Sequence, residues 1–489
     1  MLFNSYIFIL LFLPLTAALY FLLHKYLPAM WPRLFLLLAS LGFISFWNVS
    51  FVLILILSVI FNFACGSILS AKSRKNAAGK KPVFIAAITA NILFLGFFKY
   101  CNFFLENINA VFSSHIGALH ILLPIGISFY TFMQIAWLTD IYRRGGYRYD
   151  FISYCLYVTF FPYVIAGPIT YHDEVIPQMQ SESARSFSTA NLCRGLFIFS
   201  IGLFKKTAIA DTLAIIADGG FAASGSLTFT EAWLTSLSYT MQLYFDFSGY
   251  TDMAIGAALV FNIDLPANFN SPYKSLSIQE FWRRWHITLS RFLRDYIYIP
   301  LGGNRSGESR TLINLMLTFL IGGLWHGAAW TFVFWGFLHG AALCVHRLWT
   351  KTGLHMHQAI AWILTFNFIN VAWVFFRASS FSDAISLLKG MAGLNGILVS
   401  PNLADSAFWQ SLTAVGIRFG EWRENLPPAE TPVYFFCILL IPFVLILKNS
   451  GEMLSQYSPN WRNALAVSLM MIAGLLLLNE TSSFLYFNF

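Results

Sequence analysis

The chain has 489 residues, of which 57% are hydrophobic and only 11% are charged, and its formal net charge is +8. Soluble domains carry about 25% charged residues, so this composition excludes an ordinary soluble protein and indicates a multi-pass membrane protein. Lysine and arginine collect in the cytoplasmic loops of such proteins. We therefore interpret the positive charge as a sign of topology and expect no nucleic-acid partner.

Apolar runs of helical length follow one another along the whole chain. A bilayer crossing needs about 20 apolar residues, which predicts about ten to twelve transmembrane helices. The predicted ranges are 6–23, 34–47, 51–70, 82–99, 117–139, 193–216, 232–262, 311–325, 329–348, 360–376, 433–448 and 463–478. We expect an all-α protein with one membrane-embedded domain over 1–489, additional interfacial or re-entrant helices, and a loop or short helices over 390–431.

The termini and loops give a provisional topology. The first apolar run has no basic segment before it and no cleavage site after it, so we expect a retained helix. Basic residues cluster between Lys72 and Lys81 and between Arg143 and Arg148, which predicts two cytoplasmic loops and an external amino terminus. The six cysteines show no metal-ligand spacing, so we expect small core residues and no metal.

His326 lies in a stretch from Leu312 to Val345 that contains no Asp, Glu, Lys or Arg. An ionisable side chain at membrane depth is costly unless it is buried against partners or faces a wet cavity. His326 is therefore the first candidate for a functional residue.

The segment from Ser277 to Tyr296 has apolar and basic residues at helical spacing. Wound as one continuous helix, it places aromatic and aliphatic residues on one face and basic residues on the opposite face, which predicts an interfacial helix with His286 at the edge of the apolar face. The basic residues are Arg283, Arg284, Arg291 and Arg294. They would either attract anionic lipids or bind the phosphates of a nucleotide-bearing cofactor, because guanidinium groups match phosphate geometry.

Two further pairs of charged residues interrupt apolar runs. Lys205 and Lys206 would either extend to the lipid headgroups or complete the phosphate site. Asp246 and Asp252 are six residues apart and do not share a helical face, so we expect them to satisfy polar partners and not to act as a catalytic pair.

Four segments together resemble the signature segments of the membrane-bound O-acyltransferase family. They are Tyr244–Tyr250, Phe281–His286, Tyr298–Asn304 and Leu324–Gly327. The resemblance is to the bacterial branch of the alginate O-acetylase and peptidoglycan O-acetyltransferase A type. It runs through nearly the whole chain, including Ala166–Ile169 and the terminal Phe484–Phe489.

This resemblance implies a helical fold that is thin at its centre, where a cytoplasmic funnel for acetyl-CoA meets an external funnel. By match to the family motifs, His326 is the catalytic histidine and His286 supports it. A thioester is already activated, so such a site needs a base for the acceptor hydroxyl, donors for the oxyanion and exclusion of water. Imidazole suits the first task near neutral pH.

The remaining histidines are expected to be structural. His339 and His346 follow His326 in the same apolar region, and His346 adjoins Arg347 at an expected helix end. The others are expected in or near loops: His24, His115, His120, His172, His355 and His357.

The chain has no Gly-Asp-Ser nucleophile segment with a downstream Asp-x-x-His, and no external domain large enough for a glycan. We therefore expect a relay in the bacterial inner membrane that hands acetyl to a separate periplasmic acetyltransferase of the SGNH, esterase-like type. The acceptor is expected to be a cell-envelope polysaccharide, with peptidoglycan favoured over alginate. Tyr486 of the tail is either the acyl relay, because its phenol can carry an ester, or part of an interfacial aromatic anchor.

Two other functions fit part of the sequence. In a secondary transporter, His326 and the lysine and aspartate pairs would form a path for a coupling ion. A D-alanyl or lipid acyltransferase would share the fold but use another donor. Release of free CoA from acetyl-CoA separates the first alternative from acetyl transfer, and a donor panel separates the second.

Overall fold

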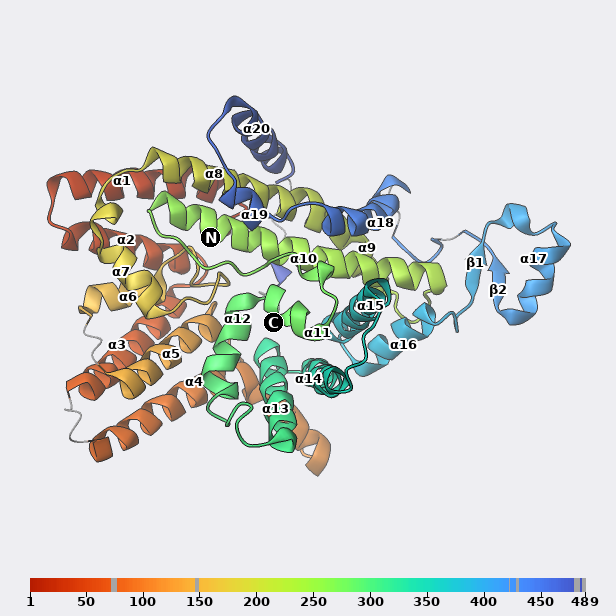
Figure 1. Ribbon diagram of the computed structural model, residues 1–489, viewed down its shortest axis with the longest axis horizontal. Helices are drawn as coiled ribbons and strands as arrows, with labels where there is room; N and C mark the ends of the chain where they lie inside the picture. The colour runs from red at the N-terminus through yellow and green to blue at the C-terminus, as the bar shows by residue number, and fades with distance from the viewer. Residues whose placement is uncertain (72–76, 146–148, 422, 428–430, 479–483, 486–489) are drawn as a thin grey trace.

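The computed structural model describes residues 1–71, 77–145, 149–421, 423–427, 431–478 and 484–485, and within these ranges the chain is almost entirely helical. The amino-terminal half contains η1 (Ile7–Phe12), α1 (Leu13–Tyr26), α2 (Met30–Ser45), α3 (Val49–Ala71), α4 (Ala77–Phe112), α5 (Ile127–Arg144), α6 (Phe151–Thr159), α7 (His172–Gln180), η3 (Glu182–Arg185), α8 (Thr189–Phe204), η4 (Lys205–Ala210), α9 (Asp211–Ala222) and α10 (Phe229–Val260). Figure 1 shows α10 crossing the middle of the molecule beside α8.

The carboxyl-terminal half continues with shorter elements. These are η5 (Pro272–Lys274), α11 (Ile278–Arg284), α12 (Ile287–Leu293), η6 (Arg294–Tyr298), α13 (Glu308–His326), α14 (Trp330–Lys351), α15 (Gln358–Arg377), α16 (Phe381–Met391), β1 (Ile397–Val399), η7 (Pro401–Leu403), α17 (Ala407–Ser411), η8 (Leu412–Val415), β2 (Ile417–Phe419), α18 (Thr431–Ile446), α19 (Ser450–Ser455) and α20 (Trp461–Leu476). The segment around β1, α17 and β2 projects from the helical body (Figure 1).

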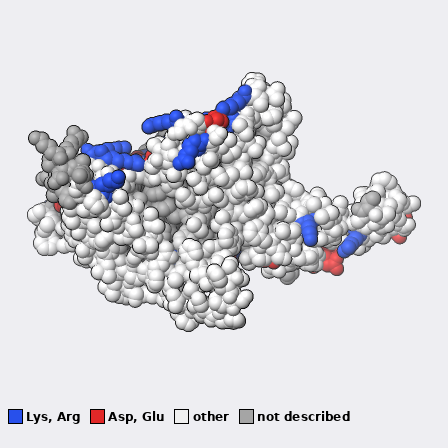
Figure 2. All heavy atoms as spheres, turned by 90° about the horizontal axis from the view of Figure 1, so that it is seen from below, with Lys and Arg blue, Asp and Glu red and all other residues white. Residues whose placement is uncertain are grey.

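The surface of the helical body is apolar, as a lipid-facing surface requires. Large side chains such as Leu93, Val111 and Ile446 are 66%, 74% and 76% exposed. Figure 2 shows the lysine and arginine side chains of this view gathered along one edge and on the projecting segment, with a nearly uncharged face between them. This segregation is typical of a membrane protein with one basic face.

Several helices are long and apolar enough to cross a membrane. Among the described residues, four meet both conditions: Ile7–Tyr26, Val49–Ser70, Gly79–Phe112 and Gln358–Arg377, and three shorter apolar helices span Met30–Ser45, Thr431–Ile446 and Trp461–Leu476. The expected all-α membrane architecture is confirmed. The number of crossings and the side of each loop stay predictions.

Close packing of α8 against α10 builds the centre of the molecule. A Cβ atom on Gly202 would lie 2.5 Å from the carbonyl oxygen of Gly249, and one on Gly256 would lie 2.6 Å from that of Gly195. Small residues at these crossings let two backbones approach, which is how helices associate tightly in a membrane. As a result, α10 is buried along most of its length.

The predicted helices are found, with four corrections. The helix predicted over 82–99 extends beyond both ends, as α4 from Ala77 to Phe112. The run predicted over 117–139 is helical only from Ile127, because Gly126 before it adopts the left-handed conformation with φ 73°. The interruption at 390–431 contains the expected short helices, but β1 and β2 also pair there in parallel, which the sequence did not predict. The single helix predicted over 277–296 is broken into α11 and α12 at Trp285 and His286.

Candidate active site

His326 is the last residue of α13 and is only 4% exposed. Its ring packs at right angles against Trp335 of α14 and Phe376 of α15, with ring centroids 5.0 and 5.1 Å away. Trp325, the preceding residue, stacks on Phe132 of α5. Three helices therefore enclose the imidazole in aromatic surface, which limits the access of water to it.

Glycines bring α13 and α14 close enough to form this enclosure. A Cβ atom on Gly323 would lie 2.4 Å from the carbonyl oxygen of Phe332, and one on Gly336 would lie 2.3 Å from that of Phe319. Gly327, directly after His326, would place a Cβ atom 2.1 Å from the Phe332 ring. The glycines around the histidine are therefore required by packing.

His286 lies at the break between α11 and α12 in the left-handed conformation, with φ 42° and ψ 54°. A residue other than glycine rarely adopts this conformation, and such strain persists only where the surroundings enforce it. The break turns the imidazole fully into the interior, where it is 0% exposed. His286 is thus a core residue and does not lie at the edge of an interfacial helix, as the sequence predicted.

Asn268 fixes the orientation of His286. The Oδ1 atom of Asn268 accepts hydrogen bonds from the backbone N–H and the hydroxyl of Thr288, at 3.3 and 2.9 Å. The Nδ1 atom of His286 lies 3.1 Å from the same oxygen. Because that oxygen is an acceptor, Nδ1 must donate, which leaves Nε2 of a neutral His286 as an acceptor.

The two histidines lie close together inside the molecule. Their ring centroids are 6.5 Å apart, and the Trp325 ring contacts both of them. The sequence predicted this pair from separate segments, and the structure brings the two together. The arrangement places one buried imidazole, which can act as a base, beside a second imidazole of fixed orientation, within largely aromatic surroundings.

The four arginines of this region do not form one surface. Arg283 and Arg294 are exposed, whereas Arg284 and Arg291 are partly buried. Because of the break at His286, the continuous helical wheel that placed all four on one face is wrong. Arg284 is held by Glu280 at 2.8 Å, and the exposed Arg294 by the adjacent Asp295 at 2.7 Å.

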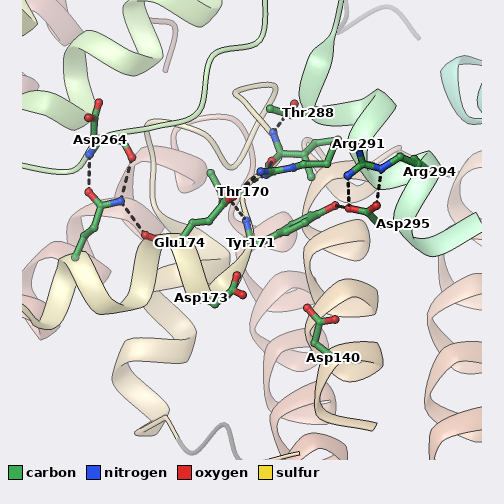
Figure 3. Close-up of polar contacts among 12 residues, drawn as sticks. Asp140, Thr170, Tyr171, Asp173, Glu174, Asp264, Thr288, Arg291, Arg294 and Asp295 are labelled. Carbon is green, nitrogen blue, oxygen red and sulfur yellow. Dashed lines mark hydrogen bonds and ion pairs between the residues drawn. The ribbon is translucent and has the colours of Figure 1, made fainter. Parts of the chain in front are cut away.

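Arg291 belongs to a polar network at the start of α7 (Figure 3). Its guanidinium pairs with both carboxylate oxygens of Glu174 and lies 4.1 Å from the ring centroid of Tyr171. Tyr171 in turn donates to Asp295 at 3.3 Å. Burial disfavours the charge of Arg291, but the hydrogen bonds that it donates to the Glu174 carboxylate outweigh this effect and raise the pKa of Arg291. Arg291 is therefore held in a partly buried ion pair, and the phosphate-binding hypothesis depends more on Arg283 and Arg294 because these two are exposed, although Asp295 also pairs with Arg294.

Lys205 and Lys206 lie on a π-helical turn, η4, that faces α10. Lys205 pairs with Asp252 at 2.7 Å, and Lys206 pairs with Asp246 at 2.6 Å and with Asp211 at 2.8 Å. The aspartates thus have polar partners, as the sequence predicted. Because carboxylates already balance both ammonium groups, the structure favours a stabilising role for the lysines over phosphate binding.

The chain re-enters the core near its carboxyl end. Phe484 is 2% exposed and stacks on Tyr250, with ring centroids 4.5 Å apart, and it also contacts Phe247. The N–H of Leu485 donates to Asp246 at 2.9 Å. Phe247 in turn packs against His286 at 4.8 Å. Phe484 is therefore a core residue and not an interfacial one, whereas Tyr486, which the relay and anchor alternatives concern, lies outside the described residues.

Comparison with known proteins identifies the family of this chain. The model of the MBOAT, membrane-bound O-acyltransferase family, matches residues 41–381, a range that includes both histidines. The chain belongs to this family.

Individual relatives of the MBOAT chain cover most or all of it. A peptidoglycan O-acetyltransferase of Helicobacter pylori is 45% identical over 100% of this chain and 98% of its own length. A probable alginate O-acetylase, AlgI, of Pseudomonas aeruginosa is 40% identical over 80% of this chain and 75% of its own. A teichoic acid D-alanyltransferase of Bacillus subtilis is 26% identical over 53% of this chain and 69% of its own.

The MBOAT chain is therefore an acyltransferase, and the site offers two features that acyl transfer needs, an imidazole that can act as a base and aromatic surroundings that limit water. His326 and His286 are both buried and adjacent. A neutral imidazole accepts the proton of an attacking hydroxyl, and aromatic walls keep competing water away. Membership of the family favours acyl transfer over the secondary-transporter alternative.

Sequence reasoning missed two residues and misplaced a third in this MBOAT chain. Lys99 and Tyr100 of α4 donate to the final carbonyls of α13, next to His326. The predicted helix ended at Lys99, whereas α4 continues to Phe112, so the lysine lies inside the helix and not at its end. His172 was expected in a loop but begins α7 fully buried, with Nε2 3.3 Å from a carboxylate oxygen of Asp140.

Proposed function

We propose that this enzyme takes acetyl from acetyl-CoA at the cytoplasmic face and relays it across the bacterial inner membrane. A periplasmic acetyltransferase of the SGNH type then esterifies a cell-envelope polysaccharide. The observation that carries the proposal is the buried pair of His326 and His286, in a chain that is similar over its full length to the peptidoglycan O-acetyltransferase of Helicobacter pylori. Peptidoglycan is therefore the favoured acceptor, and alginate or another exopolysaccharide is the alternative.

The transfer step uses His326 as the general base. Its imidazole takes the proton of the acceptor hydroxyl while the oxygen attacks the thioester carbonyl. The tetrahedral intermediate then collapses, the carbon–sulfur bond breaks, and the CoA thiolate leaves and takes the proton from the His326 imidazolium, which restores the base. His286, with Nε2 as an acceptor, is suited to orient the hydroxyl or to share its proton.

The donor is tested by the release of free CoA from a panel of acyl donors. Purified protein in lipid nanodiscs is expected to release CoA from acetyl-CoA, but not from palmitoyl-CoA, and to leave a D-alanyl carrier unchanged. Equal or faster turnover of either alternative donor would replace the acetyl proposal by the corresponding acyltransferase.

The exposed arginines give a prediction for the donor side. Replacing Arg283 and Arg294 together by glutamine is expected to raise the apparent KM for acetyl-CoA several-fold, with kcat nearly unchanged. The effect should be larger at low salt, because exposed charges act over about 10 Å at 0.1 M ionic strength and further below it. Arg462→Gln, which removes an exposed arginine of α20, is the matched control. An unchanged KM in the double variant would return this pair to the lipid-binding interpretation.

The relay through Tyr486 gives a second prediction. Leu485, which directly precedes it, is bonded to Asp246 next to the aromatic wall of His286. If the phenol accepts acetyl from His326-catalysed attack, Tyr486→Phe should abolish polysaccharide acetylation, because only the nucleophilic oxygen is lost. Tyr457→Phe, which changes a tyrosine that packs on Phe197 of α8, is the control and should be tolerated.

Mass spectrometry of the terminal peptide completes this test. In the absence of the periplasmic partner, the wild-type peptide is expected to carry one acetyl group, which Tyr486→Phe should lose. Wild-type acetylation of the polysaccharide by Tyr486→Phe would exclude the relay and leave direct transfer from acetyl-CoA.

A further inference from the structure

The carboxyl end of α13 is capped from another helix. The last four carbonyl groups of any helix have no partner within the helix and must find one elsewhere. Here Gly327 follows in an extended conformation, and not in the left-handed one that usually closes a helix. The hydroxyl of Tyr100 donates to the carbonyl of Leu324 at 2.7 Å. The ammonium group of Lys99 donates to the carbonyls of Trp325 and His326, the latter at 3.1 Å.

Backbone carbonyl groups compensate the positive charge of Lys99. Among the described residues, no carboxylate lies within ion-pair distance of this lysine, although a partly buried ammonium group is costly without compensation. The compensation comes from the two carbonyls and from the negative end of the α13 dipole. The ring of Trp325 adds a further contact, with Nζ 5.8 Å from its centroid.

We infer that Lys99 and Tyr100 are positioning residues. Their hydrogen bonds, which we call the clamp, hold the last turn of α13 in place and keep His326 in its catalytic position. Terminal helical turns open readily unless other groups hold them. His326 is the terminal residue of this turn, and its imidazole has to stay between Trp335 and Phe376. A displacement of about 1 Å of a reacting group can cost about 10²-fold in rate. The inference rests on the proposed role of His326 as the base.

The test compares steady-state kinetics of CoA release by variants in nanodiscs, with the periplasmic acetyltransferase and an acceptor polysaccharide present so that turnover is continuous. Lys99→Met keeps the length of the side chain and removes its charge and its bonds. We expect kcat to fall about 10- to 100-fold while the KM for acetyl-CoA stays within about two-fold, because a residue that positions the base affects the chemical step and not donor binding. Lys99→Arg can still donate to both carbonyls and should recover most of kcat. Asn102→Ala is the matched control, since Asn102 of α4 donates instead to the carbonyl of Leu119.

If Lys99→Met does not fold, Tyr100→Phe is the variant that tests the inference. It keeps the ring and removes one hydrogen bond, so kcat should fall by about 2- to 10-fold. At least one of these two variants is measured beside His326→Ala. If its kcat is unchanged while His326→Ala is inactive, the clamp is excluded and the proposed function is not affected. A raised KM at normal kcat would also overturn it, because the lysine would then serve donor binding. Full activity of His326→Ala would instead remove the proposed function and the clamp with it.

Discussion

His326→Ala is expected to lower acetyl transfer by about 10²- to 10⁴-fold, the contribution that a general base makes to a reaction. The imidazole is the last side chain of α13 and is buried beside His286, so no exposed group can replace it. The measurement is CoA release in nanodiscs, together with the acetyl content of the envelope in a strain whose only copy is the variant.

Two controls make this result specific. The variant has to reach the membrane in normal amount, which a tagged protein shows by immunoblot. His339→Ala removes another buried histidine, whose Nδ1 accepts from Trp282 at 3.1 Å, and it should lose far less activity per folded molecule. His286→Ala is expected to be intermediate. Wild-type envelope acetylation in a well-expressed His326→Ala strain would exclude His326 as the base.

The largest effect on stability is expected from Lys206→Met. Lys206 balances Asp246, which is 1% exposed and also holds the N–H of Leu485. Removal of one partner of a buried ion pair leaves an uncompensated charge and typically costs about 3–5 kcal/mol. We therefore expect a clearly lower midpoint of thermal unfolding in detergent.

An exposed ion pair provides the comparison. Lys351 contacts Glu308 at 2.7 Å, but its side chain is 53% exposed. Exposed pairs contribute only about 0–1 kcal/mol, so Lys351→Gln should unfold close to the wild-type midpoint. Equal midpoints for Lys206→Met and Lys351→Gln would show that the buried pair does not stabilise the fold.

Much of the fold and the central residue could be predicted from the sequence. Apolar runs identify membrane helices reliably, because a lipid-facing backbone must bond within its own segment. His326 stood out because an ionisable group is rare within a long uncharged stretch. The partners of Asp246 and Asp252 were also expected to be polar, although the sequence did not identify them as Lys206 and Lys205.

The rest depends on contacts between distant segments. No local pattern predicts that His286 adopts a left-handed conformation, since Asn268 and the surrounding core enforce it. The helical wheel assumed one continuous helix over this segment, so it placed all four arginines on one face, which the structure does not show. Lys99 lies more than two hundred residues before the carbonyls that it caps, so its role follows only from the packing of α4 near α13. The entry of Phe484 into the core is a contact of the same kind.

The central claim is that acetyl enters at the cytoplasmic face and leaves at the other. Inverted membrane vesicles expose the cytoplasmic face to added acetyl-CoA, and sealed right-side-out vesicles expose the opposite face. With labelled acetyl-CoA outside, inverted vesicles that contain the wild-type protein should release CoA and carry label to their interior, and His326→Ala vesicles should do neither. Sealed right-side-out vesicles should leave acetyl-CoA intact. Equal consumption by both kinds of vesicle, or label that never crosses the membrane, would contradict the relay.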